Sequence, residues 1–181
     1  MPAPTVLVIL ADGFEEIEAV TPIDVLRRAG AEVTVAALGE GIHVTGRNGL
    51  TIHASTTLAS AMGSTFDCVM LPGGPGVARL REDARVLDLV RNQEGRGGWI
   101  AAICAAPAVL KSAGVLNGRR HTAHFSVKSE LPDALFNERF VVDGRLITSR
   151  GAGTALDFGL LLAEKLFSRE AAAEVARSIS A

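Results

Sequence analysis

One cysteine of this sequence stands where a thiol can do chemistry. Residues 100–103 are apolar and lead directly into Cys104, and Pro107 follows at a position typical of the first residues of a helix. The residues two before and two after the cysteine, Ala102 and Ala106, are small. Small residues also flank the nucleophile on the strained strand-to-helix turn of α/β hydrolases. We therefore interpret Cys104 as a nucleophile presented at such a turn.

The position of Cys104 predicts an unusual ionisation. A thiol at the N-terminus of a helix lies near unpaired backbone N–H groups and the positive end of the helix dipole. Both favour the thiolate, so we expect the pKa of Cys104 to lie below the ordinary value of about 8.5. The alternative is a small buried hydrophobic residue, which free cysteines often are. That alternative fits Cys68 better, because Cys68 lies inside a predicted strand.

Three carboxylates, Glu15, Glu16 and Glu18, follow the first apolar run of the chain. Negative charge is favourable where a helix begins, and this explains Glu15 and Glu16. Glu18 can instead point inward across the strand ends, where burial raises the pKa of a carboxyl group. A protonated Glu18 would donate a hydrogen bond to a thiolate, whereas an ionised Glu18 would act as a general base.

Other groups can complete a site around the cysteine. The backbone N–H groups of Gly73 and Gly74, which follow another predicted strand, and of Ala105 can stabilise an oxyanion. His121 and His124 lie where we expect a strand to end. This position favours a role in the site for one of these two histidines.

No metal site is expected from the sequence, because it contains neither Cys-x-x-Cys nor His-Glu-x-x-His. His43 and His53, near a predicted hairpin, are interpreted as structural. The glycine-rich loop at 73–76 is not a phosphate-binding Walker A loop, because no Gly-Lys-Ser/Thr follows it.

An alternation of strands and helices must position these residues. Strands are predicted at 6–10, 32–37, 68–71, 99–103, 140–142 and 146–149, a small hairpin at 44–45 and 51–53, and helices at 15–29, 85–96, 107–113, 154–166 and 170–178. Pro22 predicts a kink in the first helix, or a new start with Thr21 as its N-cap. The alternation predicts an α/β fold with a parallel sheet covered by helices on both faces. Ligands bind at the carboxyl ends of such strands.

Composition bounds the class of protein. The chain has 181 residues, 48% of them hydrophobic, and a formal net charge of −2, which fits one domain spanning residues 1–181. No Lys/Arg run or acidic tail indicates a nucleic-acid or membrane partner. Two cysteines make no disulfide framework and suit a reducing compartment. The first apolar run ends at Asp12 and is too short for a signal or membrane segment, so we expect a cytoplasmic protein.

Four segments together resemble a known family. They are VLVILADGFEEIE at 6–18, VMLPGG at 69–74, IAAICAAP at 100–107 and TSRGAGT at 148–154. The chain resembles the parkinsonism-associated deglycase clade of the ThiJ/PfpI superfamily along nearly its whole length. The resemblance implies a flavodoxin-like three-layer sandwich, a homodimer, and a site that needs neither a metal nor an organic cofactor.

The resemblance also implies roles for single residues. It makes Cys104 the nucleophile, Glu18 its protonated partner, Gly74 and Ala105 the N–H donors, and His124 the site histidine.

Further matches and departures concern the surroundings of the site. Arg27, Arg28 and Arg47 match positions near the dimer interface and the pocket. Three residues depart from the pattern of many relatives, in which proline or glycine is common: Ala106, Phe125 and Ala152. These departures bear on the shape of the pocket more than on its chemistry.

The implied function is an enzyme of carbonyl detoxification. Such an enzyme acts as a glyoxalase on methylglyoxal and other small 2-oxoaldehydes, or as a deglycase on early glycation adducts of proteins and nucleotides. The alternative is a redox-sensing or chaperone-like protective protein that uses the same oxidisable cysteine. A noncatalytic structural α/β domain is the third interpretation. The first two share their residues, and only a measurement of turnover separates them.

Overall fold

The computed structural model describes residues 2–181. Within them, seven strands form one sheet in the order β5-β2-β1-β6-β7-β9-β8. The strands are β1 (Thr5–Leu10), β2 (Glu32–Ala37), β5 (Thr56–Thr57), β6 (Cys68–Leu71), β7 (Trp99–Ile103), β8 (Phe140–Asp143) and β9 (Leu146–Ser149), and a separate hairpin joins β3 (His43–Thr45) to β4 (Thr51–His53). The helices are α1 (Glu16–Arg28), α2 (Leu58–Ala61), α3 (Val77–Glu82), α4 (Ala84–Gly95), α5 (Pro107–Ala113), α6 (Ala155–Leu166) and α7 (Arg169–Ser178), with 3₁₀ turns at Phe125–Val127 and Ala152–Thr154.

The strand order places a ligand site at one edge of the sheet. The parallel strands β2, β1, β6, β7 and β9 lie side by side, which is the flavodoxin-like order 2-1-3-4-5 when they are counted along the chain. The order reverses between β1 and β6. In doubly wound sheets, ligands bind beyond the carboxyl ends of the strands at such a reversal.

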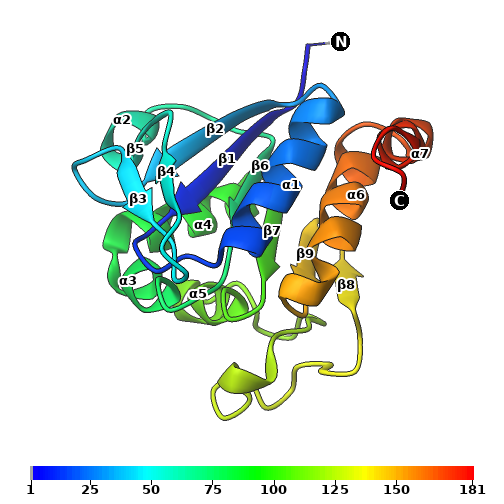
Figure 1. The fold of residues 1–181 in the computed structure, drawn as a ribbon. Helices are drawn as coiled ribbons and strands as arrows, with labels where there is room; N and C mark the ends of the chain where they lie inside the picture. The colour runs from blue at the N-terminus through cyan, green and yellow to red at the C-terminus, as the bar shows by residue number, and fades with distance from the viewer. Residues whose placement is uncertain (1) are drawn as a thin grey trace.

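Helices cover both faces of the sheet, as the sequence predicts. In Figure 1, α1, α6 and α7 lie on one face, and α3, α4 and α5 lie on the other. Alternate residues of β1 divide between the two core layers: Val6 and Val8 pack with the α1 and α6 side, whereas Leu7 and Ile9 pack with the α4 and α5 side. The flavodoxin-like three-layer sandwich is therefore confirmed.

The first helix runs through Pro22 without a new start. It begins after Glu15, whose carboxylate accepts a hydrogen bond from the backbone N–H of Glu18 at 2.8 Å. The predicted restart at Thr21 is wrong, because the cap at Glu15 already fixes the start of the helix six residues earlier. Pro22 is buried, and a Cβ at Gly159 of α6 would lie 3.1 Å from its Cα. The proline thus belongs to the close packing of α1 against α6.

Other differences lie in short elements. The elements β5, α2 and α3 were not predicted, because two to six residues are too few to show a clear period. His121 and His124 do not end a strand, since residues 121–124 belong to no strand of the sheet. No helix found within residues 2–181 combines the length and apolarity needed to cross a membrane.

Candidate active site

Three loops converge at the carboxyl edge of the sheet. They follow β1, β6 and β7, and they bring Glu18, Gly73–Gly74 and Cys104 together. Cys104 has φ 65°, a left-handed conformation that non-glycine residues seldom adopt. Such a conformation costs about 1–3 kcal/mol and persists only where the surroundings enforce it.

Backbone hydrogen bonds enforce the strained turn at Cys104. Its N–H donates to the carbonyl of Ser149 at 2.9 Å, and its carbonyl accepts from the N–H of His124 at 2.8 Å. Ala102 and Ala106 on either side are fully buried, so larger residues would not fit there. The sharp turn that the sequence predicts between β7 and α5, with Cys104 at its bend, is thus present in the structure.

The side chain of Glu18 lies across the strand ends from Cys104. Only 1% of Glu18 is exposed. Its carboxyl group accepts a hydrogen bond from the N–H of Gly73 at 2.9 Å and another from the N–H of Ala152, and it contacts the Cys104 thiol. Glu15 helps to set this orientation, because it caps α1 at the backbone of Glu18.

The close approach of Glu18 and Cys104 requires glycine at position 73. A Cβ there would lie 2.5 Å from Oε2 of Glu18 and 2.7 Å from Cβ of Cys104. We expected the N–H of Gly73 to face an oxyanion, but this is wrong, because that N–H is bonded to Glu18. The N–H groups of Gly74 and Ala105 act on the Cys104 thiol by lowering its pKa, which is consistent with the donor roles that the resemblance implies.

Burial raises the pKa of the Glu18 carboxyl to about 7. The negative charge of Glu15 contributes to this rise, whereas the hydrogen bonds from Cys104, Gly73 and Ala152 act in the opposite direction. Near neutral pH, Glu18 is therefore poised between its protonated and ionised forms, which suits a group that must both take up and release a proton.

The Cys104 thiol does not have the lowered pKa that its place before a helix suggests. Burial raises its pKa to about 12, and the negative charge of Glu18 and a hydrogen bond to that carboxylate add to the rise. The N–H groups of Ala105 and Gly74 lower it, but burial outweighs them. The sequence hides this effect because Glu18 is 86 positions away along the chain.

The contact between Glu18 and Cys104 allows the two groups to exchange a proton. The charge of Glu18 disfavours the thiolate only while the carboxylate is ionised. When the proton lies on Glu18, the same contact becomes a hydrogen bond donated to the sulfur, and the N–H groups of Gly74 and Ala105 support the thiolate. Transfer of the thiol proton to Glu18 would therefore produce the thiolate without release of that proton to water.

His124 lies at the rim of this pair. Its Nδ1 is 2.9 Å from Oγ of Ser126, and its ring packs against that of Phe125 with centroids 4.1 Å apart. Burial and the positive charge of Arg47 lower the pKa of His124, so its imidazole is neutral at pH 7. His121 is buried elsewhere, with Nδ1 3.0 Å from the carbonyl of Arg119.

A cavity of about 450 Å³ opens over the cysteine. Its walls are formed by Glu15, Glu18, Arg47, Gly74, Pro75, Cys104, Ala105, His124, Ser126 and Ala152. Sequence reasoning missed Glu15 and Ser126 as parts of this site. Glu15 was explained by the preference for negative charge where a helix begins. No sequence pattern identifies Ser126 as a site residue, and only its position two residues after His124 could have indicated it.

Other candidates lie apart from the cavity. Arg27 donates to the carbonyl of Val33, and Arg28 pairs with Asp24 at 2.7 Å. Cys68 is 0% exposed, and burial raises its pKa to about 12, so its interpretation as a buried hydrophobic residue agrees with the structure.

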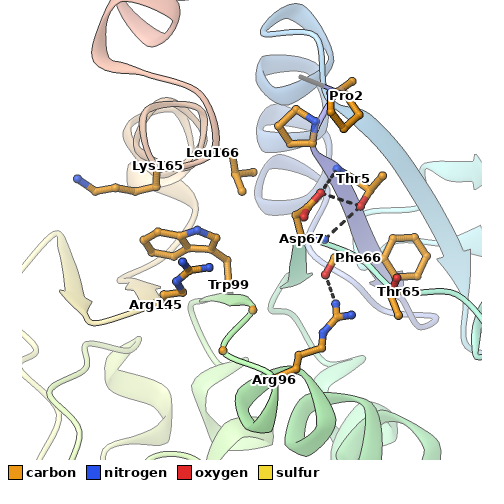
Figure 2. Close-up of a pocket in the computed structure, with 14 residues that line it drawn as sticks. Pro2, Thr5, Thr65, Phe66, Asp67, Arg96, Trp99, Arg145, Lys165 and Leu166 are labelled. Atoms are coloured by element: carbon orange, nitrogen blue, oxygen red, sulfur yellow. Dashed lines mark hydrogen bonds between the residues drawn. The ribbon is translucent and has the colours of Figure 1, made fainter.

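A larger cavity, of about 540 Å³, lies at the opposite, amino-terminal edge of the sheet. Figure 2 shows Trp99, Arg145 and Lys165 on one side of it and Thr5 and Asp67 on the other. Neither a cysteine nor a histidine lines this cavity. Size alone therefore does not mark the site of chemistry.

Comparison with known proteins gives consistent matches. The model of the DJ-1/PfpI family matches residues 4–165. Protein dj-1beta of Drosophila melanogaster is 47% identical over 177 residues, which cover 96% of this chain and 95% of that protein. The crystal structure of Drosophila melanogaster DJ-1beta has a TM-score of 0.93 and 44% identity, with 98% of each chain covered.

The names of two further similar proteins concern the chemistry of the family. A deglycase of Pyrococcus abyssi is 34% identical over 151 residues, which cover 82% of this chain and 90% of that protein. A structure described as oxidized DJ-1 of Toxoplasma gondii has a TM-score of 0.93 and 36% identity, with 98% of each chain covered.

Proposed function

The chain belongs to the DJ-1/PfpI family, and we propose that it is a glyoxalase and deglycase with Cys104 as its nucleophile. One observation carries the proposal: a strained, cavity-facing cysteine contacts a buried carboxyl group whose pKa is raised to about 7. A nucleophile and an adjacent group that exchanges protons are the two parts that the reaction needs. The deglycase of Pyrococcus abyssi supports the same chemistry in the family.

The reaction of a 2-oxoaldehyde begins with the proton on Glu18 and the charge on sulfur. The thiolate of Cys104 forms a bond to the aldehyde carbon, and the carbonyl oxygen takes up the proton to give a hemithioacetal. The N–H groups of Gly74 and Ala105 flank the sulfur and stabilise negative charge that develops beside it.

Glu18 then moves a proton between neighbouring carbons. Its carboxylate removes the proton from the former aldehyde carbon, which leaves an enediolate, and returns that proton to the adjacent carbon. The hydroxyl proton of the first carbon passes to the oxygen of the second. The first carbon is thereby oxidised to a thioester and the second reduced to an alcohol, so no external oxidant is consumed. Water cleaves the thioester, which releases the 2-hydroxy acid and restores the thiol.

A deglycase reaction would use the same groups on a glycated adduct. The cavity of about 450 Å³ has room for a small 2-oxoaldehyde or for the sugar-derived part of an adduct. Glycated proteins and nucleotides are thus the proposed larger substrates, and the cytoplasm is the proposed location.

Turnover of methylglyoxal is the test of this function. The wild-type protein should convert methylglyoxal to lactate, and Cys104→Ser should reduce the rate to background, because a serine hydroxyl is a far weaker nucleophile than a thiolate. The matched control is Cys68→Ser, which alters the buried cysteine outside the cavity. No turnover by wild-type protein, or equal turnover by Cys104→Ser, would reject the proposal.

A redox-sensing role is the second candidate function, because the contact between Glu18 and Cys104 can also stabilise an oxidised form of the Cys104 sulfur. A protonated Glu18 would donate a hydrogen bond to a sulfinate at Cys104, and hydrogen bonds to charged groups contribute about 1.5–3 kcal/mol. The relative from Toxoplasma gondii is described in an oxidized form. Mild peroxide should then abolish turnover and raise the melting temperature by a few degrees. A lower melting temperature of the sulfinate form would argue against the role of Glu18 as its donor.

A homodimer is the proposed assembly. Three large apolar side chains near the first helix and the hairpin are exposed: Ile17 by 53%, Val20 by 45% and Leu50 by 62%. Their exposure is consistent with a second copy of the chain that covers this side, and two-fold symmetry is the commonest arrangement of such oligomers. Sedimentation equilibrium should give twice the chain mass at micromolar concentration, and a monomer mass would refute the dimer.

A further inference from the structure

The cavity of about 540 Å³ at the amino edge of the sheet takes no part in the proposed chemistry. Strand pairing brings its residues together. Ile100 of β7 pairs with Leu146 of β9, so the residues just before them, Trp99 and Arg145, are neighbours where the two strands begin. Lys165, near the end of α6, lies on the same side of the cavity (Figure 2). The three apolar side chains of the proposed dimer surface do not line it.

A buried amide holds the backbone around this cavity in place. Gln93 is only 3% exposed. Its amide nitrogen lies within hydrogen-bond distance of the carbonyls of Phe66, Asp67 and Trp99, at 3.1, 3.3 and 3.0 Å. Glycine is required at position 98, where a Cβ would lie 2.3 Å from that nitrogen. The loop before β6 is thereby tied to the start of β7, and a ligand meets a preformed site.

Positive charge exceeds negative charge in this cavity. Its lining includes three cations, Arg96, Arg145 and Lys165, and a single carboxylate, that of Asp67. This carboxylate is already engaged, because it accepts hydrogen bonds from the N–H and the hydroxyl of Thr5 at 2.8 and 3.0 Å (Figure 2). An anion that enters the cavity therefore meets unbalanced positive charge.

The cations are available to such an anion. Among residues 2–181, neither Arg96 nor Arg145 pairs with a carboxylate. Lys165 pairs with its neighbour Glu164 at 2.8 Å, but both side chains are about one-third exposed, and such surface pairs are weak. The guanidinium carbon of Arg145 lies 5.8 Å from the centroid of the half-buried Trp99 ring, so a cation and an aromatic ring occur side by side.

We propose that this cavity binds a small phosphate ester with a planar ring, of which a nucleoside monophosphate is the simplest example. The phosphate accepts hydrogen bonds from Arg145 and Lys165, since the planar fork of arginine matches phosphate oxygens. The planar ring stacks on the indole of Trp99. A phosphate monoester carries about −1.5 to −2 charges at neutral pH, which suits several cations better than a carboxylate does. The volume of the cavity lies in the range of small-molecule sites.

Trp99 provides a direct test because it is the single tryptophan of the chain. AMP should quench its fluorescence to saturation, with excitation at wavelengths that adenine does not absorb, and calorimetry should give one site per chain. Adenosine and inorganic phosphate should each bind at least about tenfold more weakly, because each keeps only one of the two recognised groups. Higher ionic strength should weaken the binding of AMP.

Variants separate the two parts of the site. Arg145→Gln should weaken AMP binding by at least about tenfold, because it removes a charge-assisted hydrogen bond from an exposed position that the fold does not need. Trp99→Leu, measured by calorimetry, should weaken it by at least about fivefold through the loss of stacking. The matched control is Arg177→Gln, which removes the same charge from the exposed surface of α7, outside the cavity, and should bind AMP as the wild type does.

The cysteine cavity at the opposite edge must be excluded as the place of binding. Alkylation of Cys104 obstructs that cavity and should leave the affinity for AMP unchanged. Loss of AMP binding after alkylation would place the ligand there and overturn the proposal. Equal affinity in Arg145→Gln, equal binding of adenosine or inorganic phosphate, or the absence of saturable binding at millimolar AMP would each overturn it as well.

Discussion

The two edges of the central sheet hold cavities of similar size and opposite chemistry. The cavity at the carboxyl ends, about 450 Å³, contains the strained Cys104 and the buried Glu18. The cavity at the amino ends, about 540 Å³, is lined by the cationic side chains of Arg96, Arg145 and Lys165 (Figure 2). The guanidinium carbon of Arg145 lies 5.8 Å from the centroid of the Trp99 ring.

Chain direction explains this contrast. At the carboxyl edge, strands lead into the N-termini of helices, where free N–H groups can support a thiolate. At the amino edge, α4 and α6 end, and the carbonyls at helix C-termini favour cations such as Arg96 and Lys165. A parallel sheet therefore offers a nucleophile at one edge a kind of support that the other edge lacks.

The largest expected difference between the edges is in turnover. Glu18→Gln should lower methylglyoxal turnover by roughly 10²–10⁴-fold, because an amide cannot carry the proton between carbons. The equivalent change at the opposite edge, Asp67→Asn, alters the carboxylate that binds the N–H and hydroxyl of Thr5 and should leave turnover unchanged. Steady-state rates of both variants measure the contrast. Undiminished turnover in Glu18→Gln would exclude Glu18 as the proton carrier.

The next difference is in the pH dependence of stability. The pKa of Glu18 is raised from 4.5 to about 7 in the folded state, so the folded protein retains a proton that the unfolded chain has lost. The stabilisation from this group is complete below about pH 4.5 and is lost as pH rises to about 7, a change of about 3 kcal/mol. Urea unfolding at several pH values should show this loss in wild-type protein relative to Glu18→Gln. A constant difference between the two would contradict the raised pKa.

The smallest effect sharpens the contrast between the two cysteines. The Glu18–Cys104 pair loses its first proton near pH 7, so alkylation of Cys104 by iodoacetamide should accelerate about tenfold between about pH 6 and 8. Cys68, at the amino end of β6 and fully buried, should remain unmodified in the folded protein. Peptide mapping at each pH distinguishes the two thiols. If the rate rises only near pH 12, Glu18 does not accept the proton of the thiol.

Much of the fold was predictable because its central strands are continuous apolar runs. The predicted limits of β6, β7 and α5 agree with the structure, since each is bounded by glycine, proline or a change of hydrophobic pattern. The helix α3 was missed because Val77 and Leu80 are its only buried residues, too few to reveal a period.

The cysteine and carboxyl group at the centre of the candidate site were predictable, but the energetics of the site were not. Small residues around Cys104 indicated the turn, and the position of Glu18 after β1 indicated a partner. The pKa of the thiol depends on burial and on a contact between residues far apart in sequence, and local sequence reports neither. Ser126 and the use of the Gly73 N–H likewise depend on which loops meet at the sheet edge.

The single contact between Glu18 and Cys104 has a consequence for how fast the site can respond. The pair carries one negative charge whether the proton lies on sulfur or on the carboxyl group, so activation moves a charge over one hydrogen bond without creating a new one. The dipoles around it, from the N–H groups of Gly73, Gly74 and Ala105, are fixed by the backbone and already face both positions of the charge. Solvent and protein therefore need little reorganisation when the nucleophile forms, so reorganisation adds little to the cost of moving the proton from the thiol to Glu18.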